Sequence, residues 1–237
     1  MMPNPQLPPR VIYTKQIICL ANSRKLKGRC IAGIEISDAQ DPVWIRPVTT
    51  SPTGEIPESA CAYSLGQPIN VLDVLEVRLV ESRAKGYQQE NWLIDRQVRP
   101  WTHIGRAVPA DIEKVISKQP TLWTNGSSSK GGVNDRIDGA AMDNINNSLQ
   151  LVKVDQLYLE VKAPYEGDGP PDLRASFVYK QNHYNLKVTD HRYEASYRSK
   201  SVGTYALRTA YLTISLGEPF KGFVYKLVAA IIDPKLL

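Results

Sequence analysis

Hydrophobic and polar residues alternate along several segments in the second half of the chain. Apolar residues occupy every second position over 156–162, and a similar period recurs over 174–180, 184–190 and 209–216. A period of two indicates a β-strand that buries one face and exposes the other. The segment 223–232 is apolar on both faces, as expected of a central strand. The second half of the chain is therefore predicted to hold five strands.

The first half of the chain contains shorter apolar runs separated by turn-forming residues. Two of these runs, at 16–22 and 28–36, flank a polar turn, which is a typical signal of a β-hairpin. Three more strands are predicted at 43–48, 71–81 and 90–95. Two consecutive sets of about five short strands indicate two small β-structures in tandem.

The predicted fold class is all-β, with one or two short helices and two tandem small β-barrels of OB type. The OB-fold is a five-stranded Greek-key barrel that fits each set of strands. The pattern alone is also compatible with another small barrel or with a sandwich, because these folds contain the same short alternating strands.

One segment has the pattern of a helix. Over 108–120, Pro109 suits the first helical position, Ile112, Val115 and Ile116 share a face, and Pro120 ends the pattern. The Gly/Ser-rich stretch that follows is typical of a long loop. The predicted organisation is a flexible tail at 1–10, a first barrel with a C-terminal helix at 11–118, a linker or lid loop at 119–150 and a second barrel at 151–237.

Composition narrows the class of protein. Apolar residues make up 42% of the 237 residues and charged residues 22%, which is typical of a globular protein. No apolar run reaches about 18 residues, so no membrane partner is expected. The N-terminal ten residues lack the apolar core of a signal peptide. Three cysteines without secretory features predict reduced thiols and a cytoplasmic location.

The net charge of +5 hides an uneven distribution. Residues 1–50 contain seven Lys and Arg against three Asp and Glu, residues 51–173 contain 12 against 17, and residues 174–226 contain nine against three. Two basic segments therefore flank an acidic middle. Clustered basic charge is the electrostatic signature of a polyanionic partner, such as a nucleic acid or a nucleotide.

The tip of the first predicted hairpin concentrates cations and small polar residues. In a small barrel, the loop between the first two strands borders the ligand face. The candidate ligand-binding residues at this tip are Asn22, Ser23, Arg24, Lys25 and Arg29. A solvated turn that simply carries basic side chains is the alternative interpretation.

Arg46 lies in the middle of the predicted strand 43–48, among apolar neighbours. A mid-strand arginine must reach water or meet an anion or a carboxylate. We therefore expect Arg29 and Arg46 either to line the mouth of the first barrel and bind a ligand, or to pair with an internal carboxylate such as Glu90.

Basic and aromatic residues are interleaved in the C-terminal half, where nine of the twelve tyrosines lie beyond residue 150. Single-stranded nucleic acid is held by aromatic rings that stack on bases and by cations that contact phosphates. Tyrosine is also common in strands for packing reasons alone. The candidate nucleic-acid-binding residues are Tyr184, Lys187, Arg192, Tyr197, Arg198, Lys200 and Arg208.

The Gly/Ser-rich stretch ends in charged residues that could close over a ligand. Its sequence "SKGGVNDRID" lacks the spacing of a Walker phosphate loop, but Asp135 and Arg136 are candidate ligand-binding residues. No catalytic motif is found, and three scattered histidines without a CxxC pair predict no metal site. No cofactor is expected, and the pattern leaves open whether the chain is an enzyme.

Five segments in sequence order resemble the dual OB-containing domain family of bacterial and phage proteins: "ICLANSRKLKGRCIAGIE", "VWIRPV", "LDVLEV", "QQENWLID" and "GEPFKGFVYKLVAAII". The resemblance covers most of residues 16–232. It implies two OB-folds in tandem and a role in binding or modifying nucleic acid, and it supplies no catalytic residues. The residues that it places on family motifs are Asn22, Ser23, Arg24, Arg29, Arg46, Gln89, Glu90, Asn91 and Lys226.

Three functions are compatible with these features. The leading hypothesis is a module that binds nucleic acid or a nucleotide, with a single-stranded or phosphate-containing ligand and a non-catalytic or accessory role. The first alternative is an enzyme that modifies a nucleotide or a nucleic acid. The second is a protein-interaction subunit of a larger bacterial or phage complex.

Overall fold

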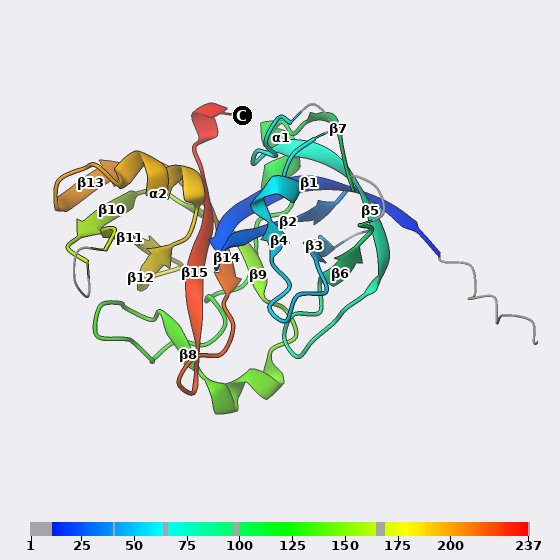
Figure 1. Ribbon diagram of the computed structural model, residues 1–237. Coiled ribbons are helices and arrows are strands. Elements are labelled where there is room, and N and C mark those ends of the chain that lie inside the picture. The colour runs from blue at the N-terminus through cyan, green and yellow to red at the C-terminus, as the bar shows by residue number, and fades with distance from the viewer. Residues whose placement is uncertain (1–10, 40, 64–65, 97–99, 165–168, 237) are drawn as a thin grey trace, which may run out of the picture.

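The computed structural model describes residues 11–39, 41–63, 66–96, 100–164 and 169–236, and the tail predicted at 1–10 lies outside these ranges. Strands dominate the described chain, which confirms the predicted fold class. Two β-structures lie side by side (Figure 1). Strand β1 of the first contacts strand β15 of the second at their junction. No described helix is long and apolar enough to cross a membrane.

The first sheet closes into a barrel. Its strand order is β1-β2-β3-β6-β5-β7, and β1 also pairs with β5. The strands β3 and β6 pair in parallel, as the third and fifth barrel strands, whereas the other pairs are antiparallel. The bounds are β1 (Tyr13–Lys25), β2 (Gly28–Glu35), β3 (Trp44–Val48), β4 (Ile56–Pro57), β5 (Asp73–Ser82), β6 (Asn91–Ile94) and β7 (Trp101–Arg106).

The second sheet repeats this topology. Its order is β13-β10-β11-β12-β15-β14-β9, with β12 and β15 in parallel. Only two residues separate β9 from β10, so together they occupy the place that β1 has in the first barrel. The bounds are β8 (Arg136–Asp138), β9 (Leu149–Val154), β10 (Leu157–Lys162), β11 (Asp172–Tyr179), β12 (Asn182–Val188), β13 (Gly203–Leu207), β14 (Ala210–Leu216) and β15 (Phe223–Ile232).

The helices are short. The helix predicted over 108–120 is limited to α1 (Pro109–Glu113), because the backbone N–H of Ser117 donates to the carbonyl of Leu151 at 2.7 Å and draws the chain onto the second barrel. A second helix, α2 (His191–Tyr197), was not predicted; the Asp190 carboxylate caps its first turn. Three 3₁₀ turns complete the set: η1 (Glu58–Ala60), η2 (Gly139–Asn144) and η3 (Pro234–Leu236).

Strand β1 is apolar on both faces because each face packs into a different core. Ile17 and Cys19 point into the first barrel, whereas Ile18 and Leu20 belong to a cluster shared with residues of the second barrel, such as Leu151. Burying both faces of one strand stabilises the two barrels against each other. This shared cluster fixes how the surfaces around the barrel junction face one another.

The Gly/Ser-rich segment lies along the second barrel. Leu122 enters the core of that barrel, and Val133 forms a two-way backbone bridge with Asn185 on β12. The Ser129 N–H and hydroxyl both donate to Asp135, at 2.7 and 2.5 Å. In this conformation the segment forms one wall of the groove described below.

Candidate functional site

The tip of the β1–β2 hairpin docks on the second barrel. The backbone N–H of Arg24 donates to the carbonyl of Thr189 at 2.8 Å, and Nδ1 of His191 lies 2.8 Å from the carbonyl of Asn22. The side chains of Asn22 and Ser23 are buried there. The hairpin tip is therefore part of the junction between the barrels, and its cations face the second barrel as well as solvent.

A groove of about 1370 Å³ lies beside this junction. Its walls come from the hairpin tip, helix α2, the outer side of β11 and β12, the Gly/Ser-rich segment and the β14–β15 turn. Among the described residues, two carboxylates, Asp172 and Glu194, line it. The basic residues in its lining are Arg24, Arg29, Lys130, Arg136, Arg174, Lys187, Arg198 and Lys221.

Both carboxylates of the groove are already engaged by cations. Arg24 donates through Nε and Nη2 to the two oxygens of Glu194, at 2.9 and 2.8 Å, and this contact raises the pKa of the guanidinium. Nζ of Lys187 lies 2.9 Å from Asp172. Arg29 pairs instead with Glu58 of η1, outside the groove lining. The described part of the lining thus keeps an excess of positive charge.

Four lining cations, Lys130, Arg136, Arg198 and Lys221, form no ion pair with another described residue. Of these, Arg136 donates to the hydroxyl of Ser127 at 3.1 Å. Nζ of Lys221 lies 5.3 Å above the ring of Phe220, which is itself exposed. Tyr197 and Tyr225 add two more aromatic side chains to the lining. Unpaired cations next to exposed rings are what a strand of phosphates and bases requires.

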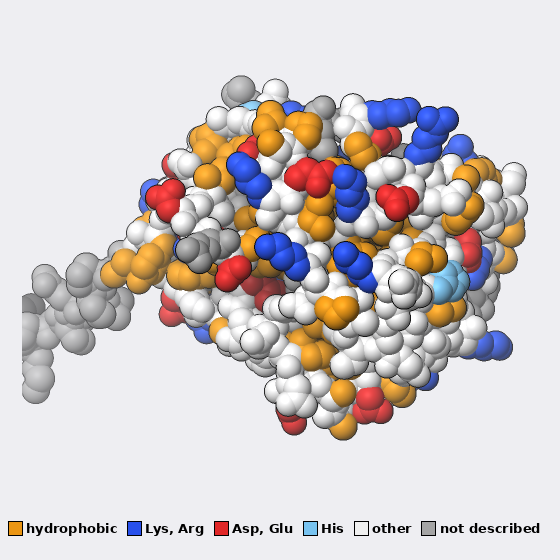
Figure 2. All heavy atoms as spheres, turned by 180° about the vertical axis from the view of Figure 1, so that it is seen from behind, with side chains coloured by type: hydrophobic (Ala, Val, Ile, Leu, Met, Phe, Trp, Pro, Cys, Tyr) orange, Lys and Arg blue, Asp and Glu red, His pale blue; other side chains and the backbone are white. Residues whose placement is uncertain are grey.

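The positive charge of the groove is not a property of the entire surface. Figure 2 shows the molecule from the side opposite to Figure 1, and on that face Lys and Arg side chains are interspersed with Asp and Glu. Mixed charges of this kind produce little net field. The excess in the groove is therefore local.

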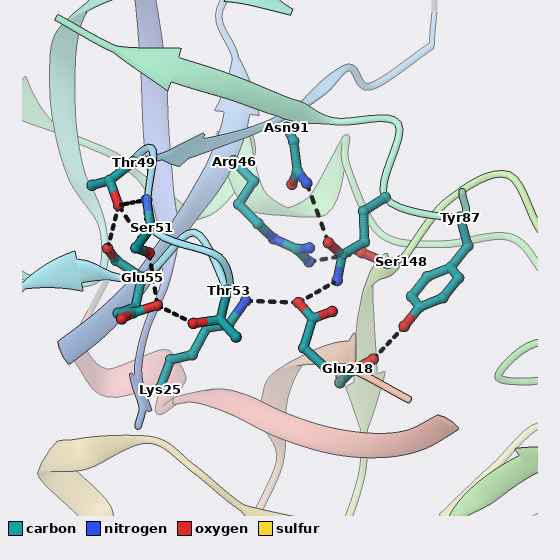
Figure 3. Close-up of polar contacts among 12 residues, drawn as sticks. Lys25, Arg46, Thr49, Ser51, Thr53, Glu55, Tyr87, Asn91, Ser148 and Glu218 are labelled. Atoms are coloured by element: carbon teal, nitrogen blue, oxygen red, sulfur yellow. Dashed lines mark hydrogen bonds and ion pairs between the residues drawn. The ribbon is translucent and has the colours of Figure 1, made fainter. Parts of the chain in front are cut away.

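Arg46 is buried in a polar cluster that connects the barrels (Figure 3). Its Nη2 lies 3.1 Å from Oε1 of Glu90 and donates to Oγ of Ser148 at 2.8 Å, and the Ser148 hydroxyl in turn donates to Glu90. Ser148 directly precedes β9 of the second barrel. Arg46 therefore makes the internal carboxylate pairing that the sequence offered as one of its two alternatives.

Arg174 lines the groove, but its guanidinium is already hydrogen-bonded to other residues of the protein. Its side chain is buried, and it donates through Nε to the Asn185 side chain at 2.6 Å and through Nη2 to Asp135 at 3.0 Å. These bonds hold the Gly/Ser-rich segment against β11 and β12. Asp135 is thereby a positioning group for the groove wall.

Lys226 and Tyr184 lie inside the second barrel. Nζ of Lys226 donates to the carbonyl of Thr124 at 2.6 Å, and the Tyr184 hydroxyl donates to Oδ1 of Asn125 at 3.1 Å. Burial lowers the pKa of Lys226 to about 8. Both side chains hold the chain over 124–125 in place.

The remaining candidates divide between the groove and its surroundings. Of the residues expected from the sequence, the groove brings together Arg24, Arg29, Arg136, Lys187, Tyr197 and Arg198. Lys25 and Asn91 line a second, smaller pocket. Arg192 donates to the carbonyl of Ile231 at 3.3 Å, Lys200 lies over the rings of Tyr197 and Tyr205, and Arg208 is exposed outside the groove.

Several lining residues were not predicted from the sequence: Lys130, Arg174, Phe220, Lys221 and Tyr225. The signal for two of them was present in the turn "GEPFKG", where Lys221 and Gly222 both have positive φ. Such a tight turn exposes the side chains at its tip.

Comparison with known proteins identifies a family for this chain. The model of the family described as "Dual OB-containing domain" matches residues 15–231, which is most of the chain. Neither the curated proteins nor the solved structures provide a significant match.

Proposed function

The chain belongs to the dual OB-containing domain family, and from this membership and the groove we propose that it binds single-stranded nucleic acid as a non-catalytic module. The observation that supports the proposal most is the charge of the described groove lining, in which eight cations stand against two carboxylates. Phosphate contacts provide most of the affinity of such interfaces.

The position of the groove on the second barrel supports the same function. OB-folds bind oligonucleotides over their second and third strands, between the loop that joins strands one and two and the loop that joins strands four and five. In the second barrel these strands are β11 and β12, and Pro170 and Phe220 come from the two corresponding loops. All of these elements contribute to the groove.

The size and chemistry of the groove favour a strand over a single small molecule. Its volume of about 1370 Å³ exceeds the ~300–1,000 Å³ that is usual for small-molecule sites. Exposed rings allow bases to stack without sequence preference. The side chains of Lys130, Arg198 and Lys221, which form neither an ion pair nor a hydrogen bond with another described residue, could contact successive phosphates.

Fluorescence anisotropy with labelled single-stranded DNA and RNA, at two ionic strengths, tests the proposal. We expect binding at low salt that weakens steeply as salt is added. Lys221→Ala should weaken it, whereas Lys114→Ala, which removes an exposed lysine outside the groove, should not. Failure of both nucleic acids to bind at low salt would refute the proposal.

A further inference from the structure

A second pocket, which we name the seam pocket, lies on the first-barrel side of the junction and has a volume of about 250 Å³. The end of β1, the β3–β4 loop and the β5–β6 loop form most of it, and Glu218 of the β14–β15 turn closes it from the second barrel. Its lining consists of Lys25, residues 48–54, Arg83, Lys85, Gln88, Asn91 and Glu218.

The seam pocket has an excess of positive charge. Nζ of Lys25 lies 3.0 Å from Oε1 of Glu218. Burial alone would raise the pKa of Glu218, but Lys25 and Gln88 together lower it, so the carboxylate stays ionised. Among the described residues, Arg83 pairs only with exposed Glu81, at 2.6 Å, and Lys85 forms no ion pair. Three lining cations therefore face one lining carboxylate, and a second carboxylate, Glu55, accepts hydrogen bonds from the lining hydroxyls of Ser51 and Thr53.

A buried acceptor in the same pocket lacks a partner. Asn91 is 6% exposed, and its Nδ2 donates to Oε1 of Gln88 at 3.2 Å, but its Oδ1 is buried without any hydrogen bond. Figure 3 shows the Asn91 amide pointing toward the side of Lys25 and Glu218. An unsatisfied buried carbonyl oxygen is unfavourable, so a ligand that donates a hydrogen bond to it would be stabilised there.

We propose that the seam pocket binds a small phosphate monoester that also carries an N–H donor, a chemistry shared by nucleoside monophosphates. A phosphate monoester has a charge of about −1.5 to −2 near neutral pH, which Lys85, without an ion pair to another described residue, and the exposed Arg83 would attract. Its phosphate would lie between Lys85 and Arg83, and its donor would reach Oδ1 of Asn91. The volume of about 250 Å³ lies just below the ~300–1,000 Å³ of usual small-molecule sites, which favours a small, partly exposed ligand over a polymer.

This site is independent of the proposed nucleic-acid groove, since the two linings share no residue. Isothermal titration with adenosine 5′-monophosphate, inorganic phosphate and adenosine tests it in the full chain. We expect the monophosphate to bind, inorganic phosphate to bind about tenfold more weakly because it lacks the base donor, and adenosine to show no binding.

Variants separate this pocket from the groove. Lys85→Ala, at an exposed position, should weaken monophosphate binding by about tenfold or more, whereas Lys221→Ala in the groove and Lys114→Ala outside both sites should leave it unchanged. Asn91→Ser should weaken the monophosphate and not inorganic phosphate, with a thermal melt showing that the variant is folded. Equal affinity of the wild type and Lys85→Ala, or of the monophosphate and inorganic phosphate, would overturn the proposal, as would the absence of monophosphate binding.

Discussion

Arg46 and Glu90 form a buried ion pair with 3.1 Å between Nη2 and Oε1, and the hydroxyl of Ser148 bonds to both partners from the second barrel. Nε of Arg46 is buried without a hydrogen bond, so the protein leaves one donor of the guanidinium unsatisfied. A buried pair of this kind contributes little net stability, but removing one partner leaves an uncompensated charge.

We predict that Arg46→Ala lowers the free energy of unfolding by about 3–5 kcal/mol, because Glu90 would be left buried without its cationic partner. Chemical denaturation measures this loss. The double variant Arg46→Met/Glu90→Leu should recover most of it, since an apolar pair of similar volume removes the stranded charge. An additive loss in the double variant would contradict this view of the pair.

The ion pair between Arg24 and Glu194 acts differently, because both side chains are partly exposed. We predict that Glu194→Gln changes stability by less than about 1 kcal/mol but strengthens nucleic-acid binding, since it removes one of the two groove carboxylates. Anisotropy at fixed low salt measures the gain. Weaker binding by Glu194→Gln would show that the carboxylate orients Arg24 for the ligand instead of neutralising it.

Lys226 gives the second barrel a pH dependence of known sign. Burial lowers its pKa from 10.5 to about 8, so between these two pH values the unfolded chain holds a proton that the folded chain has lost. Stability rises with pH wherever the unfolded state binds more protons. The stability of the wild type relative to Lys226→Met should therefore rise from pH 8 to pH 10 and be flat below pH 7. A difference that is constant from pH 7 to pH 10 would mean that the pKa is not lowered.

Gly33 on β2 lies opposite the irregular part of β1, where the register shifts between Cys19 and Ala21. A Cβ atom at Gly33 would lie 2.2 Å from the carbonyl oxygen of Ile18, so the backbone would have to move. We predict that Gly33→Ala is clearly destabilising in a thermal melt. Gly203→Ala in β13, where nothing lies within 4 Å, is the matched control and should have almost no effect.

The alternation of apolar residues was sufficient to predict the all-β class and ten of the described strands, but it missed β4, β7, β8, β9 and β13. The alternation also indicated that Tyr184 is buried, because this residue shares a predicted strand face with Leu186 and Val188. All three side chains are buried in the structure. The helix over 108–120 was overestimated, since a local pattern does not show that Ser117 pairs with Leu151 across the junction.

The groove was only partly predictable, for a physical reason. Arg24, Lys130 and Lys221 come from three segments about 90 residues or more apart, and folding alone places them in one lining. Arg46 shows the converse. The sequence singled out this arginine but left its role open, and the structure shows that it pairs with the buried groups of Glu90 and Ser148.

The salt dependence of binding to a single-stranded DNA of about 16 nucleotides tests the central claim most directly. Each phosphate contact contributes about 0.7 to the slope of log affinity against log salt for single strands. The triple variant Lys130→Ala/Arg198→Ala/Lys221→Ala should therefore bind more weakly and have a slope shallower by about 2, while Lys114→Ala keeps the wild-type slope. An unchanged affinity and slope in the triple variant would contradict the assignment of the groove as the nucleic-acid site.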